Sequence, residues 1–169
     1  NGGETRGNQI IGNYIGTDKS GTTALANQQD GILLINARNT VISNNLISGN
    51  GDDGVDITDV ASVSFSGIGF PASCDTPPCA TGNTIILNTI GLNIAGSALG
   101  NGNSGIEIKN AEQNTIEANI IAYSSKHGVE INELTTDDCT KGNRPCTLSN
   151  TITINQIYNN VLLGIDLVD

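Results

Sequence analysis

The chain has 169 residues, of which 21 are glycine and only 3% are aromatic, and its formal net charge is −10. An acidic surface disfavours nucleic acid and anionic membranes as partners, whereas it suits solubility or the binding of cations. No apolar run approaches the length that crosses a membrane, so we expect no membrane-spanning segment. The scarcity of aromatic residues also disfavours a conventional core of large side chains.

A motif of very short strands recurs along the chain. Its skeleton is N-x-I-x-x-N-x-I, followed after a variable corner by a segment similar to G-I-x-I. Apolar and polar residues alternate over two or three positions at a time, which is the period of a strand, and no helical spacing interrupts them. Five copies are present, and their leading asparagines are Asn8, Asn39, Asn83, Asn114 and Asn150.

The copies differ in length because insertions fall at two corners of the repeat. The extended segments are 17–30 and 92–104 at one corner, and 58–82 and 132–149 at the other. Long and short intervals alternate, which indicates that a two-copy unit was duplicated. We expect one domain over 1–169, with duplicated units at about 8–82 and 83–149 and a final copy at 150–169.

Three short strands per copy predict an all-β solenoid, in which successive copies stack and their strands form parallel sheets. Equivalent apolar residues then form inward columns of mostly β-branched side chains, which suit a buried pleated surface. The leading asparagines form another column, whose amides bond to one another and to unpaired corner backbone. We expect the glycine before each third strand to supply a positive φ or a close approach. The inward columns are Ile10, Val41, Ile85, Ile116 and Ile152; Ile15, Ile47, Ile90, Ile121 and Ile157; and Ile32, Val55, Ile106, Val129 and Ile165.

Two stretches resemble a known type of repeat. They are G-N-Y-I-G-T-D-K-S-G-T at 12–22 and N-L-I-S-G-N at 45–50. Both are similar to the right-handed parallel β-helix repeats of secreted bacterial surface proteins. The resemblance implies a right-handed, single-stranded parallel β-helix of about five coils with a pectate-lyase-like solenoid fold. Pectate lyases, alginate lyases, epimerases, phage tailspikes and adhesins share such a fold, so the resemblance does not select a function.

The four cysteines form two local pairs, Cys74 with Cys79 and Cys139 with Cys146, and each pair lies within one insertion. The spacing predicts two disulfides, each closing its own loop, and hence an oxidising, extracellular or cell-surface location. The alternative is four free thiols in a cytosolic protein. Zinc is disfavoured because neither pair has a C-x-x-C spacing and the single histidine lies elsewhere.

The variable residue of the G-I-x-I segment forms an acid column. The residue is Leu33 in the first copy, and the four acids of the column are Asp56, Glu107, Glu130 and Asp166. Stacked like charges destabilise a sheet, and a divalent cation would relieve the repulsion, so this column is a candidate Ca²⁺ site. The alternative is a solvated acidic face. No cofactor is otherwise required.

No catalytic residues are predicted. The single histidine, His127, is interpreted as a surface residue at a turn. Lyases with this fold use a basic residue as proton acceptor, and Arg38, Lys109 and Lys126 are of the right type, but they share no obvious column. The sequence leans against an enzyme.

Neither end of the chain shows a capping helix. We expect self-association through the end residues Asn8, Ile10, Ile15, Ile165 and Leu167, with a second copy head-to-tail or with the rest of a longer solenoid. Because the chain starts at Asn1 rather than Met and shows no signal peptide, we expect a processed protein or an excised piece.

The function predicted from these features is structural and non-enzymatic: a secreted surface stalk, an adhesin segment or a filament subunit. The alternatives are a carbohydrate-active enzyme, such as a polysaccharide lyase or an epimerase, and a carbohydrate-binding module. In both alternatives a polysaccharide is the ligand.

Overall fold

A computed structural model describes residues 5–59, 63–65, 68–70, 80–132 and 147–168. The regular structure of these residues is entirely β, and no helix among them is long and apolar enough to span a membrane. All four cysteines lie outside the described residues, so the two disulfides stay a prediction.

Fifteen of the strands form three parallel sheets of five strands each. The first sheet contains β1 (Gln9–Ile11), β4 (Val41–Ser43), β9 (Thr84–Ile86), β12 (Thr115–Glu117) and β15 (Thr151–Thr153). The second contains β2 (Tyr14–Ile15), β5 (Leu46–Ile47), β10 (Thr89–Ile90), β13 (Ile120–Ala122) and β16 (Gln156–Tyr158). The third contains β3 (Ile32–Ile35), β6 (Val55–Thr58), β11 (Ile106–Lys109), β14 (Val129–Asn132) and β17 (Ile165–Val168).

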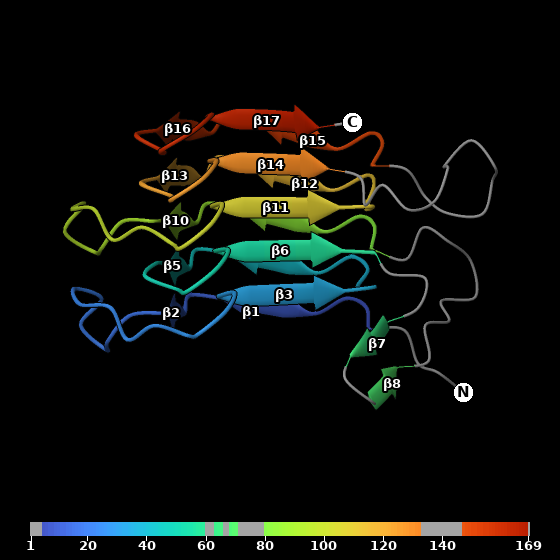
Figure 1. Ribbon diagram of the computed structural model, residues 1–169, viewed down its shortest axis with the longest axis horizontal. Coiled ribbons are helices and arrows are strands. Elements are labelled where there is room, and N and C mark those ends of the chain that lie inside the picture. The colour runs from blue at the N-terminus through green and yellow to red at the C-terminus, as the bar shows by residue number, and fades with distance from the viewer. Residues whose placement is uncertain (1–4, 60–62, 66–67, 71–79, 133–146, 169) are drawn as a thin grey trace.

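Three strands that follow one another along the chain contribute one strand to each of the three sheets, and we call such a set of three strands a unit. Units 1 to 5 are β1–β3, β4–β6, β9–β11, β12–β14 and β15–β17. They stack in chain order along one axis, with β3 at one end and β17 at the other (Figure 1). A separate antiparallel hairpin, β7 (Val63–Phe65) and β8 (Ile68–Phe70), follows β6. The arrangement is consistent with a parallel β-helix-like solenoid.

The core lies between the three sheets, where the inward columns of neighbouring units are in register. The second and third predicted columns are confirmed in full, because every member pairs with its neighbour. The first column is wrong at one position: Ile42, not Val41, pairs with both Ile10 and Ile85. Ile42 is fully buried, whereas Val41 alternates to the outer side of β4.

The same shift applies to the leading asparagine of unit 2. Thr40 takes this position, because its backbone N–H donates to Asn83 Oδ1 at 3.0 Å and its side chain is buried. Asn39 instead has a left-handed backbone with φ at 52°. The residue preceding the leading position is left-handed in every unit, namely Gly7, Asn39, Gly82, Gln113 and Ser149. Asparagine tolerates a left-handed backbone and therefore occurs at residue 39. For this reason the repeat pattern placed the leading asparagine of unit 2 one residue too early.

The second asparagine of each unit belongs to an uninterrupted ladder. Asn45 donates its backbone N–H and its Nδ2 to Asn88 Oδ1, both at 3.0 Å, and also donates Nδ2 to the carbonyl of Ile10. Asn88 repeats the pattern toward Asn119 and Ile42. The ladder therefore has a direction, since each member donates to the Oδ1 of the next unit. The ladder residues are Asn13, Asn45, Asn88, Asn119 and Asn155.

A column of glycines precedes the third strands, and close approach explains it. A Cβ atom on Gly105 would lie 2.5 Å from Ile121 Cγ2 and 2.7 Å from the carbonyl oxygen of Gly128. A Cβ atom on Gly54 would likewise lie 2.5 Å from the carbonyl oxygen of Gly105, and one on Gly128 would lie 2.5 Å from that of Gly164. These glycines have no positive φ, so close approach, and not positive φ, is the reason that glycine is needed here.

Candidate functional site

The acidic side chains predicted to stack do form one column across the third sheet. Glu107 pairs in register with Asp56 on one side and with Glu130 on the other. Asp166 follows Glu130, and Leu33 ends the column in β3. The column thus runs through four successive units, as the repeat predicts.

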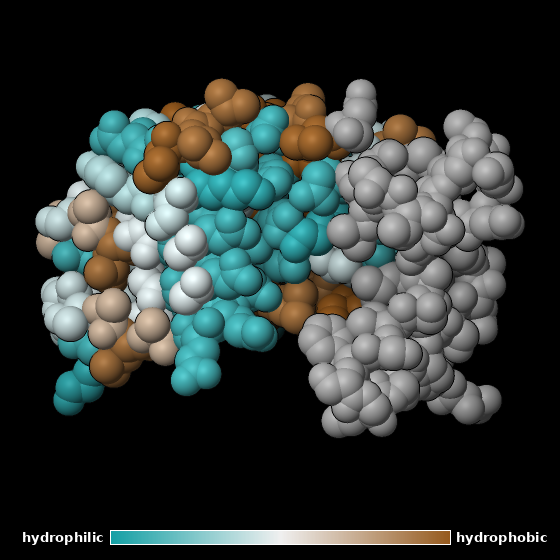
Figure 2. Space-filling model, in the orientation of Figure 1, coloured by the Kyte–Doolittle hydropathy of each residue, from teal (hydrophilic) through white to brown (hydrophobic). Residues whose placement is uncertain are grey.

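The alternative of a solvated acidic face is wrong for the inner members of this column. Asp56, Glu107 and Glu130 are only 7%, 3% and 4% exposed. The physical reason is that strand alternation places Lys109 and Asn132 on the same face, two residues after an acid, where their long or polar side chains contact the carboxylates. Figure 2 shows hydrophilic residues over the middle of this face. Buried charges require partners, and the column has several.

Two lysines provide positive charge to the column. Lys109, which ends β11, contacts the Glu107 carboxylate, and its Nζ lies 3.4 Å from Asp56 Oδ2. Burial lowers the pKa of Lys109, but its contacts with Glu107 and Asp56 outweigh burial and raise the pKa overall. Lys126, which precedes β14, donates to both oxygens of Glu130 at 2.7 and 2.8 Å. Each lysine thereby forms an ion pair with an acid of the column and orients its carboxylate.

Glu130 is the best-satisfied acid of the column. Besides Lys126, the hydroxyl of Ser104 donates to its Oε2 at 2.8 Å. Burial raises the pKa of Glu130, but the hydrogen bonds from Lys126 and Ser104 outweigh burial and lower it overall. Glu130 therefore stays ionised at neutral pH.

Asp53 adds a fifth carboxyl group to this face. It is 2% exposed, its Oδ1 accepts the backbone N–H of Ser104 at 2.8 Å, and its own N–H donates to Asp30 Oδ1 at 3.1 Å. Burial, a side-chain hydrogen bond with Glu107 and the charge of Glu107 raise the pKa of Asp53 to about 9. Asp53 therefore holds a proton at neutral pH, because burial beside another carboxyl group favours its neutral form.

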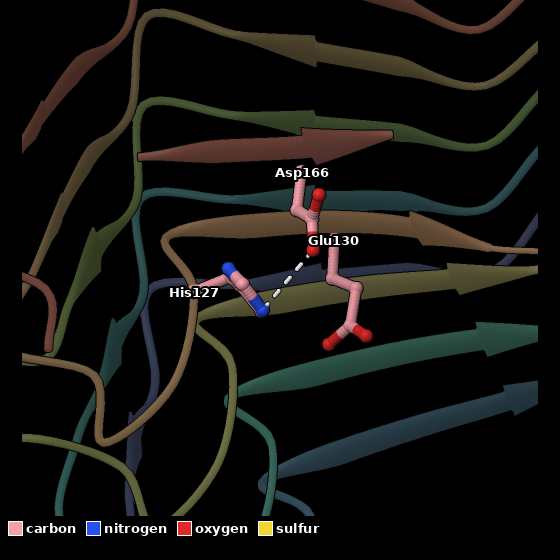
Figure 3. A group of neighbouring side chains, drawn as sticks. All are labelled: His127, Glu130 and Asp166. Atoms are coloured by element: carbon pink, nitrogen blue, oxygen red, sulfur yellow. Dashed lines mark ion pairs between the residues drawn. The ribbon is translucent and has the colours of Figure 1, made fainter. Parts of the chain in front are cut away.

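His127 lies at the corner before β14 and connects units 4 and 5. Its Nδ1 accepts the backbone N–H of Leu163 at 3.2 Å, which leaves the proton on Nε2, 3.2 Å from Asp166 Oδ2. In Figure 3 the imidazole ring points toward Asp166, whereas the Glu130 carboxylate turns away from that contact. The interpretation of His127 as a surface residue is wrong, since it is 6% exposed and the next unit covers it.

Three groups in the described part of the chain have ligand atoms within 4.8 Å of one another. They are Asp53, Asp56 and Glu107; His127, Glu130 and Asp166; and Asp30, Asp52 and Asp53. The oxygen-only groups have the ligand type that Ca²⁺ prefers. The predicted column is nevertheless divided between the first two groups. A cation at the first would displace Lys109 from the same oxygens, and one at the second would displace the Nε2 proton of His127.

The contacts of Asp53, Ser104 and Asn132 with acids of the column were not predicted from the sequence. A signal for Asp53 is present, because it occupies the position before the repeat glycine that Asp30 and His127 also occupy. In these three cases a side-chain atom accepts a backbone N–H from the next unit. The position before the repeat glycine therefore identifies Asp30, Asp53 and His127 as residues that bond to the next unit, whatever their type.

The predicted end residues lie in the outermost units. Ile10 and Ile15 are half-buried and Asn8 is exposed, whereas Ile165 and Leu167 are 45% and 70% exposed. Among the described residues, the strands of units 1 and 5 pair on one side only. Both ends of the stack therefore present strand edges that no other described strand pairs with.

The proton on Asp53 makes stability depend on pH. Between about pH 4 and about pH 9 the folded chain binds a proton that the unfolded chain lacks, so the free energy of unfolding falls as pH rises, by up to about 1.4 kcal/mol per pH unit. Asp30 and Asp56, whose pKa values burial also raises, act in the same direction. We expect Asp53→Asn to flatten this slope in urea unfolding measured from about pH 5 to about pH 9. An equally steep slope in the variant would contradict the assignment.

A comparison with known protein families finds no matching family model, and no curated protein matches the chain. The class of protein is therefore defined by the structure: an all-β chain of stacked parallel strands, consistent with a parallel β-helix-like solenoid. The pectate-lyase-like type that the sequence resemblance implies stays a prediction.

Proposed function

We propose that the chain is a structural segment of an extracellular protein, a right-handed parallel β-helix of about five coils that acts as a surface stalk, adhesin segment or filament subunit. The observation that supports this proposal best is that the side chains best suited to catalysis or ligand binding are buried and bonded to other parts of the fold. Asp53, Glu107 and His127 are each at most 6% exposed and bond to groups of neighbouring units. Groups placed in this way join units together and are closed to a large substrate.

In this proposal the inner acids of the column need no cation, because each of Asp56, Glu107 and Glu130 contacts a lysine. Lys109, Lys126 and the proton of Asp53 relieve part of the repulsion that the sequence analysis expected Ca²⁺ to relieve. The extracellular location rests on the spacing of the cysteines and on the resemblance of the repeats. The value of such a segment lies in its length and rigidity, which the ladders of side chains provide.

A second candidate, a carbohydrate-active enzyme, is favoured by one observation. A protonated Asp53 beside a second carboxyl group, that of Glu107, is an arrangement that general acid–base catalysis uses, and Lys109 contacts Glu107. Its burial weighs against substrate access, so this candidate ranks second.

The two candidates are separated by an activity assay on a panel of acidic and neutral polysaccharides. We expect no lyase, hydrolase or epimerase turnover by the wild-type chain above that of Asp53→Asn and Lys109→Met. Asp18→Asn, in an exposed loop, is the control for loss of an acid. Turnover that Asp53→Asn abolishes and Asp18→Asn preserves would replace the structural proposal with the enzyme.

A further inference from the structure

We propose that Lys109 and Asp56 form an isopeptide bond, an amide between Lys109 Nζ and the side-chain carboxyl carbon of Asp56, which links unit 3 covalently to unit 2. This inference goes beyond the proposed structural function and does not depend on it. It concerns two inner units of the stack. Four side chains with defined contacts support it, namely Lys109, Asp56, Glu107 and Thr58.

The reacting pair lies on one face of two paired strands. Lys109 of β11 pairs in register with Thr58 of β6, and Asp56 lies two residues before Thr58 on the same face. Lys109 Nζ is 3.4 Å from Asp56 Oδ2, and the two side chains are 24% and 10% exposed. Well-oriented groups held together in this way react as if at an effective concentration of roughly 10⁵ to 10⁸ M. The fold therefore supplies the proximity that separate amines and carboxylates lack.

Thr58 orients and polarises the carboxyl group that is attacked. Its hydroxyl donates to Asp56 Oδ1 at 2.6 Å, while Oδ2 faces Lys109. Attack on a carboxyl carbon develops negative charge on an oxygen, and a donor already aimed at that oxygen stabilises the charge. Burial also raises the pKa of Asp56, so its neutral and more electrophilic form is easier to reach.

Glu107 is placed to carry protons away from the amine. Its Oε1 accepts the Nδ2 of Asn132 at 2.9 Å, and its Oε2 is the atom that contacts Lys109 Nζ. Burial lowers the pKa of Lys109, but the contacts with Glu107 and Asp56 outweigh burial and raise it, so the group is an ammonium at neutral pH. The nitrogen therefore has to lose a proton as it attacks, and Glu107 is the base in contact with that proton.

The reaction needs no external reagent. Two protons pass from the Lys109 ammonium through Glu107 to Asp56 Oδ2, while Nζ bonds to the carboxyl carbon of Asp56. The bond from this carbon to Oδ2 breaks, and the oxygen leaves as water. The amide keeps one N–H, and Glu107 returns to its original state. One positive and one negative charge disappear from a largely buried site, which removes the cost of keeping both out of water.

The second lysine of the column is an internal comparison. Lys126 donates to both oxygens of Glu130 at 2.7 and 2.8 Å, but its side chain is 37% exposed and both residues belong to unit 4. Burial raises the pKa of Glu130, yet hydrogen bonds from Lys126 and Ser104 outweigh burial and lower it, which keeps the carboxylate ionised and a poor electrophile. We therefore expect no amide at Lys126.

Intact-mass spectrometry tests the bond, because its formation removes one water from the chain. The cysteines are reduced first, so that disulfides do not alter the mass. We expect the wild type and the matched control Lys126→Arg to be lighter than their sequence masses by one water. Lys109→Arg keeps the positive charge but presents a guanidinium that stays protonated, so we expect its full mass. Thr58→Val should form the bond at least about tenfold more slowly after cell-free synthesis, because it lacks the donor to Oδ1.

Chymotryptic digestion locates the bond, because cleavage after Phe65 and Phe70 separates Asp56 from Lys109. We expect a branched peptide that contains both residues and resists hydroxylamine, which opens a succinimide but not an amide. A wild-type chain of full mass would overturn the proposal and leave the structural function standing. A loss of water that persists in Lys109→Arg, or an amide between Lys109 and Glu107, would also overturn it. Urea unfolding of every variant separates loss of the bond from loss of folding.

Discussion

Gly105→Ala should destabilise the chain by about 3 kcal/mol, at the upper end of the range for overpacking a core. The new Cβ would lie 2.5 Å from Ile121 Cγ2 and 2.7 Å from the Gly128 carbonyl oxygen, so a buried side chain and a sheet backbone would both have to shift. Neither can move freely, because Ile121 is fully buried and Gly128 borders β14. The free energy of unfolding in urea measures the effect.

Gly164→Ala is the matched control for this prediction. It makes the same chemical change at the same position of the repeat, but its Cβ would meet nothing closer than 3.5 Å. We expect its free energy of unfolding to stay within about 0.5 kcal/mol of the wild-type value when the chain is monomeric. Equal decreases in the free energy of unfolding for Gly105→Ala and Gly164→Ala would show that contact with the next unit is not the reason that glycine is needed.

Asn88→Ala should cost about 3 kcal/mol, because it leaves several buried polar groups without partners. The N–H and Nδ2 of Asn45 lose their acceptor, and the carbonyl of Ile42 loses its donor. The replacement removes one rung of a ladder that crosses the whole stack, and no other described side chain lies in that column to replace it. Urea unfolding again provides the measurement.

Asn13→Ala provides the comparison at the open end of the same ladder. Asn13 is exposed, and its side chain donates only to Asn45 Oδ1 and to the carbonyl of Ile11. We expect a loss of about 1 kcal/mol or less, the value of an ordinary exposed hydrogen bond. If Asn13→Ala and Asn88→Ala were equally damaging, burial of the ladder would not be the source of its stabilisation.

Much of the architecture follows from the repeat because a stacked fold reuses one local solution. The isoleucine columns at Ile15 and Ile32 and the column through Glu107 all occur in the predicted register. The register of unit 2 was predicted wrongly because two adjacent positions both accept small polar residues. Asn39 occupies the left-handed position, and Thr40 occupies the position that bonds to Asn83. A single copy with Thr40 in the ladder position is enough to mislead a count of asparagines.

The character of the acid column was harder to predict than its position. Alternation alone places Lys109 beside Glu107 and Asn132 beside Glu130, so the covering side chains were available from the sequence. Their direction was not, because a lysine at a strand end can extend into solvent or fold back over its neighbours. The protonation of Asp53 depends on its position beside Glu107, which a corner of the repeat determines. Corners differ in length between copies, so the repeat pattern does not predict which of their residues are neighbours.

Residue-resolved hydrogen exchange of the backbone amides, at a concentration where the chain is monomeric, tests most directly whether asparagine ladders hold the units together. The N–H groups of Asn45, Asn88 and Asn119 each donate to an asparagine Oδ1 in the next unit. We predict that they exchange only through global unfolding, whereas the N–H of Asn155, in the last unit, exchanges faster through local opening. Exchange of Asn88 as fast as that of Asn155 would contradict the account.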